Sequence, residues 1–366
     1  MAIIIFIIIL LVLVLVHEFG HFFTAKRFGI RVDEFGFGFP PRLFARKYGE
    51  TEYSLNLLPI GGFVKIFGED PNDENTNGPD KKRSFIHKPK WQQAIVLFAG
   101  VFANFLLAWL LFSIGFMSGL PTSVGSELPG STLSDVHLVV IDIVPKSPAL
   151  NVGLKIGDKI VSIKSGQDSV ANINPDTLKS FVLSHSNTQI EIGYLRGQTE
   201  NVSDVLVTPV LNKTTQEPQI GISMDEVGIS KLALFPAFTQ GLSLTWFMAK
   251  STVIGLYTLI SQAIHGKGSL DSVTGPVGMV GIVGDAYQFG FVYLLSFAAI
   301  ISINLAIINL LPFPALDGGR LFFLLIEKIK GSRINPKIAN TANMIGFGIL
   351  ILLMVVITYH DVVKLF

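Results

Sequence analysis

The stretch that decides the fold is AIIIFIIILLVLVLVHEFGH, residues 2–21. The side chains of residues 2–16 are all apolar, and His17, Glu18 and His21 follow them without any turn signal. A charged side chain at the centre of a bilayer costs about 2.5–3.5 kcal/mol on insertion scales, so polar groups retained there usually have a function. An HExxH pattern inside an apolar segment therefore predicts metal chemistry at membrane depth.

The composition of the chain is that of a membrane protein with a polar portion. Of its 366 residues, 49% are hydrophobic and only 15% are charged, whereas soluble domains carry about 25% charged residues. The net charge of +1 indicates neither a nucleic-acid partner nor an acidic substrate. The absence of cysteine excludes disulfides and thiolate metal sites.

We expect an α-helical polytopic membrane protein with four transmembrane helices, a small membrane-associated β-sheet and one inserted α/β domain. Long apolar runs predict the four helices within residues 1–28, 91–118, 291–319 and 343–360. Lysine and arginine are concentrated in the segments 26–90 and 320–337, which places both segments in the cytoplasm. Both chain termini and residues 120–290 should then lie outside.

The segments between these helices predict three further regions. Residues 29–90 should form a cytoplasmic, membrane-associated β region with strands at 32–35, 52–57 and 63–66, followed by a polar loop at 69–83. Such strands must pair with one another or line a cavity, because lipid cannot satisfy backbone groups. Residues 125–225 should form the α/β domain, with strands at 137–144, 159–164, 189–195 and 202–208 and a helix at 175–185.

Residues 230–290 are the hardest region to assign. The stretch 232–264 is apolar enough for a fifth crossing, but it contains Gln240, Lys250 and Gln262. A single extra crossing would move the basic loop after the third helix to the outside. We therefore expect amphipathic helices that lie against the outer membrane face.

The metal site is predicted from spacing and from the chemistry of the ligands. His17 and His21 are four residues apart, so they project from one helix face and can share one ion. Neutral imidazole nitrogens suit zinc, and Glu18 stands at the general-base position of HExxH hydrolases. The best third ligand is Asp317, the only acidic residue between residues 286 and 326. Alternatively, Asp317 ends a helix before two glycines or pairs with Arg320.

Two asparagines in the third apolar helix have two interpretations. Asn304 and Asn309 could hydrogen-bond a substrate backbone or stabilise a developing oxyanion. They could equally form hydrogen bonds between helices, worth about 0.6 kcal/mol each. Their spacing does not separate the two roles.

Together these residues resemble the site-2 protease family of intramembrane zinc metalloproteases, most closely its bacterial RseP-like branch. The matching segments, in order, are HEFGH at 17–21, LPIGGFVK at 58–65, Gly275-Pro276, Asn304, and NLLPFPALDGG at 309–319. Residues 147–160 are similar to part of a PDZ domain. The best-known RseP type carries two PDZ domains, whereas this chain has room for one.

The resemblance implies a zinc-dependent endopeptidase with one Zn²⁺ per chain. His17, His21 and Asp317 would be the ligands, Glu18 the catalytic base, and Asn309, together with Asn304, a substrate contact. An edge strand from Tyr53 to Leu58, followed by the Gly61-Gly62 turn, would pair with an unwound substrate. The implied substrate-contact residues of this region are Tyr53, Ser54, Leu55, Asn56, Gly61 and Gly62.

The resemblance also implies partners and a location. Substrates would be single-pass transmembrane proteins in the lipid bilayer, such as an anti-sigma factor or signal-peptide remnants, already shortened by an upstream site-1 protease. The enzyme would span the bacterial cytoplasmic (inner) membrane several times, with both termini and the PDZ domain extracytoplasmic. The PDZ domain would exclude substrates with bulky external domains or bind new C-termini, and residues 230–290 would provide the external helices and a brace.

Two other functions compete with proteolysis. The chain could be a membrane-anchored PDZ adaptor whose metal site is catalytically inactive. It could also be an ion transporter that uses Glu18 and Asp317, although the sequence has no inverted repeat of the kind common in transporters.

Overall fold

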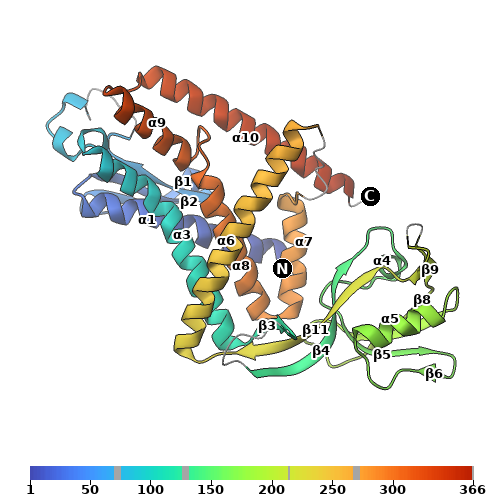
Figure 1. Cartoon of the computed structure of the whole chain (residues 1–366). Helices are drawn as coiled ribbons and strands as arrows, with labels where there is room; N and C mark the ends of the chain where they lie inside the picture. Colours follow the sequence, from blue (N-terminus) through green and yellow to red (C-terminus); the bar gives the residue numbers. More distant parts are fainter. Residues whose placement is uncertain (70–75, 126–131, 213–214, 267–272, 365–366) are drawn as a thin grey trace. The chain divides into compact units, whose positions relative to one another are not determined.

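The computed structural model describes residues 1–69, 76–125, 132–212, 215–266 and 273–364, and the chain divides into two units (Figure 1). The first unit contains Met1–Phe112, Gly241–Gly284 and Ser296–Phe366, and the second contains Ser113–Gln240 and Asp285–Leu295. The first unit holds most of the apolar helices. The second holds a seven-stranded sheet.

Four helices of the described residues are long and apolar enough to cross a membrane. They are α1 (Ala2–Arg27), α3 (Lys90–Ser118), α8 (Phe291–Leu310) and α10 (Pro336–Lys364). Their positions agree with the four predicted segments, except that α8 ends at Leu310 rather than near 319 and α10 begins earlier than predicted. Proline is favoured at the first position of a helix, and Pro336 takes that position in α10.

A fifth long helix, α6 (Leu234–Ile264), lies alongside α3 and α8 (Figure 1). Ala249 of α6 packs in one apolar cluster with Ala108 of α3 and Ala299 of α8, and the small side chains allow the helices to approach closely. The prediction of several amphipathic helices at 232–264 is therefore wrong in number, since one continuous helix spans this stretch. The position of this helix at the outer membrane face stays a prediction.

The β region consists of β1 (Val32–Tyr48) and β2 (Thr51–Ile66), each of which folds back so that the pair forms four adjacent segments. Residues 32–37 pair with 62–66 on one side, residues 34–37 pair with 52–55 on the other, and residues 42–48 pair with 51–56. The prediction of an edge strand at Tyr53–Leu58 is wrong for its first half: Tyr53 pairs with both Phe35 and Arg46. The edge segments of this sheet are 62–66 and 42–48.

The sharp reversal within β1 explains this arrangement. Gly38 has a φ of +75°, and a Cβ there would lie 2.4 Å from the carbonyl oxygen of Leu58, so the position accepts only glycine. After Gly38 the chain passes through Pro40-Pro41 and returns along the outer side of residues 51–56. Gly61 (φ +91°) lies at the next turn, where the Gly61-Gly62 turn was predicted.

Shorter elements complete the first unit. They are the 3₁₀ turns η1 (Lys81–Arg83) and η2 (Phe85–His87), and the helices α7 (Pro276–Phe289) and α9 (Asp317–Lys330). Asp361 of α10 accepts hydrogen bonds from the backbone nitrogens of Gly275 (3.1 Å) and Gly278 (2.8 Å), which caps the start of α7. Residues 70–75 of the predicted polar loop and 267–272 of the predicted brace lie outside the described residues.

The second unit is built on a seven-stranded sheet with the strand order β3-β11-β4-β5-β7-β8, in which β6 pairs with β5 beside this path. Its elements are β3 (Leu120–Ser123), β4 (Thr132–Ile143), α4 (Pro148–Asn151), β5 (Lys159–Ser165), β6 (Asp168–Ser169), α5 (Pro175–Ser184), β7 (Ile190–Leu195), β8 (Ser203–Val207), β9 (Val210–Leu211), β10 (Pro218–Gln219) and β11 (Ile222–Lys231). The helix expected at 175–185 and the strands expected within 137–208 are present. The sequence did not predict β3 and β11.

One buried ion pair fixes the turn that precedes β5. The Asp158 carboxylate is fully buried and receives two hydrogen bonds of 2.7 Å from the Arg196 guanidinium and one of 2.8 Å from the backbone nitrogen of Lys155. Hydrogen bonding to Asp158 raises the pKa of Arg196 above its usual value. Removal of either partner of such a buried pair lowers stability, because the remaining charge is left buried and uncompensated.

Candidate metal centre

The two histidines of α1 face the same point inside the first unit. Their Nε2 atoms are 3.2 Å apart, and each residue is only 7% exposed. The Nδ1 atom of His21 donates a hydrogen bond to the backbone carbonyl oxygen of Val96 at 2.8 Å. That bond places the proton of a neutral imidazole on Nδ1 and leaves Nε2 free to bind a metal.

Asp317 brings a carboxylate to the same point. Its Oδ2 atom lies 2.9 Å from His17 Nε2 and 3.2 Å from His21 Nε2. Tetrahedral zinc with bonds of about 2.0–2.1 Å holds neighbouring ligand atoms about 3.3 Å apart, so these separations fit a shared ion. The donor set of two imidazoles and one carboxylate, with a fourth position for water or substrate, fits a catalytic zinc site.

The backbone before Asp317 explains how the carboxylate reaches the histidines. Helix α8 ends at Leu310, and α9 begins at Asp317, so Asp317 lies in the first turn of a helix, where a carboxylate is favourable. Cβ atoms on Gly318 and Gly319 would lie 2.2 Å from the carbonyl oxygens of Leu311 and Phe313. The two glycines therefore let the connecting turn fold tightly against α9.

Helix α3 packs closely against the metal centre, a role that the sequence did not predict for it. A Cβ on Gly20 of α1 would lie 2.3 Å from the carbonyl oxygen of Ala99, and a Cβ on Gly100 would lie 2.3 Å from His21 Nε2. Asn104, also on α3 and fully buried, has its Nδ2 atom 3.4 Å from His17 Nδ1. Glycines on both helices thus allow α3 to contact both imidazole rings.

Glu18 borders a cavity of about 390 Å³ that is also lined by His21, Asp317, Val64 and Arg320. Its carboxylate accepts a hydrogen bond from the backbone of Val64, in the edge segment 62–66. The cavity thus joins the candidate proton-transfer group, the candidate ligands and a free strand edge. This arrangement can hold an extended peptide next to the metal position.

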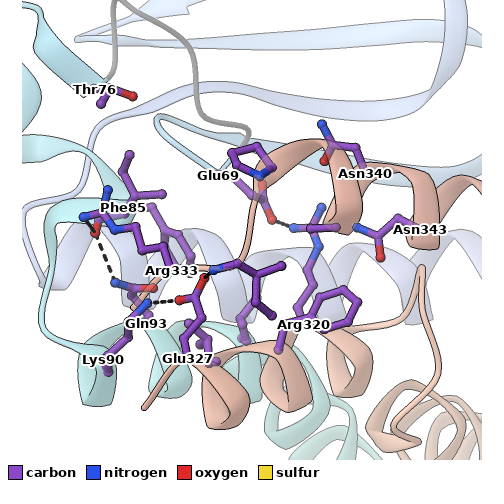
Figure 2. A pocket seen from close by; sticks show the side chains of 17 residues that line it. Glu69, Thr76, Phe85, Lys90, Gln93, Arg320, Glu327, Arg333, Asn340 and Asn343 are labelled. Carbon is purple, nitrogen blue, oxygen red and sulfur yellow. Dashed lines mark hydrogen bonds and ion pairs between the residues drawn. The ribbon is translucent and has the colours of Figure 1, made fainter. Parts of the chain in front are cut away.

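A second cavity of about 320 Å³ adjoins the first and shares four lining residues with it, Glu69, Leu97, Arg320 and Asn343 (Figure 2). Arg320 forms an ion pair with Glu69, and Lys90 pairs with Glu327 in the same cavity (Figure 2). Burial lowers the pKa of Arg320. The ion pair formed by Arg320 is with Glu69 and not with Asp317, which was the alternative partner considered from the sequence.

The residues predicted to contact substrate are only partly near the metal centre. Asn304 Oδ1 accepts a hydrogen bond of 2.9 Å from Thr252 Oγ1, so it links α8 to α6 as the interhelical alternative predicts, and its contact with substrate stays a prediction. Asn309 does not line either cavity. Asn56 donates to the carbonyl oxygen of Gly38 (3.0 Å), inside the sheet.

The other predicted contacts divide in the same way. Ser54 donates to Glu34 at 2.6 Å, and Tyr53 and Leu55 belong to the doubly paired segment. A Cβ on Gly62, by contrast, would lie 3.7 Å from Cγ of Glu18. Gly62 is thus placed directly beside the candidate catalytic carboxylate.

An HExxH helix whose histidines meet a distant carboxylate beside a cavity is the arrangement of a metallopeptidase site. A model of Peptidase family M50 matches residues 5–353. A Clostridium perfringens protein named as a zinc metalloprotease is 37% identical over 351 residues, which cover 96% of this chain and 95% of the relative. The regulator of sigma-W protease RasP of Bacillus subtilis is 30% identical and is matched over 99% of its length by 100% of this chain.

The chain therefore belongs to peptidase family M50, and the resemblance to the site-2 proteases is confirmed. It is a zinc-dependent protease of the intramembrane class. Among solved structures, the PDZ domain of an SdrC-like protein from Listeria monocytogenes matches part of this chain. The match covers 25% of this chain and 92% of that domain. The TM-score is 0.21 and the identity is 18%.

Proposed function

We propose that this chain cleaves membrane-spanning segments of single-pass proteins, with His17, His21 and Asp317 as its zinc ligands and Glu18 as its proton-transfer group. The observation that carries the proposal is the convergence of the three ligand atoms, since Asp317 Oδ2 lies within 3.2 Å of both Nε2 atoms. The histidines belong to α1, which is long and apolar enough to cross a membrane. The reaction would then take place at membrane depth.

The chemistry follows from the position of each group. His17, His21 and Asp317 would hold a zinc ion, which would supply Lewis acidity for the scissile carbonyl and for a water molecule. Glu18 takes a proton from that water and delivers it to the leaving amide nitrogen. The hydrogen bond from the Val64 backbone holds the Glu18 carboxylate at the cavity wall.

We propose the edge segment 62–66 as the place where the substrate backbone binds. A transmembrane helix hides its peptide bonds in internal hydrogen bonds, so cleavage requires local unwinding. A free strand edge offers replacement partners for the released backbone groups. Segment 62–66 pairs with β1 on one side only, and its residues Phe63, Val64 and Ile66 line the cavity with Glu18.

The proposed topology follows from the positions of the basic residues. With segments 26–90 and 320–337 in the cytoplasm, both termini and residues 120–290 lie outside a bacterial cytoplasmic membrane. The module at 125–225 acts as a PDZ domain that excludes bulky substrates or binds new C-termini. Because the Bacillus subtilis relative is named as a regulator of sigma-W, we propose that the substrates include an anti-sigma factor first shortened by another protease.

The test compares the purified full chain with Glu18→Gln on a single-pass model substrate in detergent or liposomes. The glutamine keeps the shape of the side chain but cannot accept the proton, so we expect a loss of about 10²–10⁴-fold in cleavage rate with zinc content unchanged. Glu200→Gln, at an exposed position of the second unit, is the matched control and should cleave at the wild-type rate. Chelation should abolish cleavage, and added zinc should restore it.

The same experiment separates the protease from the inactive adaptor. Equal rates for the wild type and Glu18→Gln would refute the proposed mechanism. Tight zinc binding without turnover by either protein, together with binding of peptide C-termini, would favour the adaptor.

A further inference from the structure

We infer that Asn104 is a positioning residue for the metal centre: its side-chain oxygen accepts the Nδ1–H proton of His17 and thereby leaves Nε2 of His17 free for zinc. The inference rests on the proposed ligand role of His17. It extends that proposal to a residue of α3 that neither the HExxH motif nor the segment around Asp317 contains.

The first step concerns protons. A neutral imidazole carries one N–H, and a histidine that binds metal through Nε2 must carry it on Nδ1. His17 Nε2 is the atom that faces Asp317 Oδ2 (2.9 Å) and His21 Nε2 (3.2 Å). The Nδ1–H of the buried His17 then needs an acceptor, as every buried polar group does.

The second step identifies that acceptor. The Asn104 side chain lies at His17 Nδ1, with a distance of 3.4 Å to Nδ2, and the Oδ1 atom is buried without a hydrogen-bond partner. In this orientation the amide could only donate to Nδ1, which would move the imidazole proton to Nε2. A half-turn of the amide exchanges its oxygen and nitrogen, and the oxygen then accepts from Nδ1–H. Only this second orientation agrees with a metal at Nε2.

The third step is the position of Asn104 in the protein. It is the only amide side chain between Gln93 and Ser113 in an otherwise apolar helix, and it is fully buried. Ser302 of α8 donates a hydrogen bond of 2.8 Å to its backbone oxygen, which fixes this turn of α3 against the neighbouring helix. A polar side chain retained at such a place costs stability unless it has a partner.

The fourth step is a comparison with His21, whose Nδ1 atom also has an acceptor on α3. Val96, two turns earlier on α3, provides its backbone oxygen to His21 Nδ1 at 2.8 Å. One helix therefore supplies an acceptor to Nδ1 of each ligand, from a backbone carbonyl for His21 and from an amide for His17. Partners of this kind orient the imidazole, and their removal typically lowers metal affinity by about 10–100-fold.

The test measures zinc affinity, independently of proteolysis, by competition with a chelator on the purified full chain. Asn104→Leu removes the acceptor and should weaken zinc binding by about 10–100-fold. Asn104→Asp keeps an acceptor of the same shape, without the amide's extra N–H groups, and should bind zinc within a few-fold of the wild type. Gln93→Leu, a buried amide replaced on the same helix, should lose thermal stability and keep wild-type affinity.

Two outcomes would overturn the inference: wild-type zinc affinity in Asn104→Leu, or equal losses in Asn104→Leu and Asn104→Asp. His17→Ala separates this inference from the proposed function. If His17→Ala retains zinc, the proposed ligand set fails. If it loses zinc while Asn104→Leu does not, only the role of Asn104 fails.

Discussion

Replacing Gly100 by alanine should remove the metal from this enzyme. An added Cβ would lie 2.3 Å from Nε2 and 2.7 Å from Cε1 of His21, and 2.8 Å from Cε1 of His17. Non-bonded heavy atoms rest at about 3.5–4.0 Å, so His21 must retreat by about 1 Å. Metal–ligand distances tolerate only about 0.2 Å, so the displaced imidazole can no longer share the ion.

The assay is zinc content per chain after purification, with the thermal midpoint measured in parallel. Alanine is favoured over glycine in a helix interior by about 1 kcal/mol, so local helix propensity does not predict unfolding. Gly255→Ala in α6 and Gly348→Ala in α10 are matched controls, because a Cβ at either position meets nothing within 4 Å. We expect one zinc per chain in both controls. For Gly100→Ala we expect a zinc affinity more than about tenfold lower and, as a result, a clear deficit in zinc content.

A Gly100→Ala protein that keeps one zinc and wild-type turnover would refute the reasoning, because it would mean that α3 does not define the position of the ligands. A protein that loses zinc but melts like the controls would support it. Zinc content and thermal midpoint must therefore be measured on the same preparation, so that loss of metal is distinguished from unfolding.

Two further predictions concern residues outside the metal centre. Thr252→Val removes the hydrogen bond to Asn304 and should cost about 1 kcal/mol of stability with KM unchanged, whereas a raised KM would return Asn304 to substrate binding. The hydrogen bond from His137 holds the pKa of Asp135 below its usual value, so its contribution to stability is present above about pH 4 and is lost as pH falls through the lowered pKa. The difference in thermal midpoint between the wild type and Asp135→Asn should therefore shrink below about pH 4, and a constant difference at lower pH would contradict this account.

The convergence of three side chains was predictable because each signal was local or unique. The spacing of His17 and His21 fixes a common helix face, whatever the rest of the chain does. Asp317 was found by elimination, as the only acid in a long apolar region. Pro312 and Pro314 cannot continue a regular helix, and the chain turns between α8 and α9 at these residues.

The contribution of α3 could not be predicted from spacing, because it depends on how two helices pack. The signals were nonetheless in the sequence: Gly100 and Asn104 are four residues apart, and Asn104 is a lone amide in an apolar helix. A polar group retained in an apolar helix usually has a function, and this holds for Asn104 as it does for His17. The packing of α3 against α1 then places Gly100 beside His21 and Asn104 beside His17.

The edge strand was predicted at the wrong place because strand order is not a local property. Alternating side chains predict a strand at 52–57 and say nothing about how many neighbours it has. The conformation at Gly38 lets residues 42–48 cover the outer side of that strand, which leaves 62–66 and 42–48 as the edges of this sheet. Of these two, segment 62–66 lines the cavity with Glu18. A substrate that pairs with the sheet at 62–66 therefore lies beside the proton-transfer group, whereas one bound at 42–48 would be separated from it by the intervening strands.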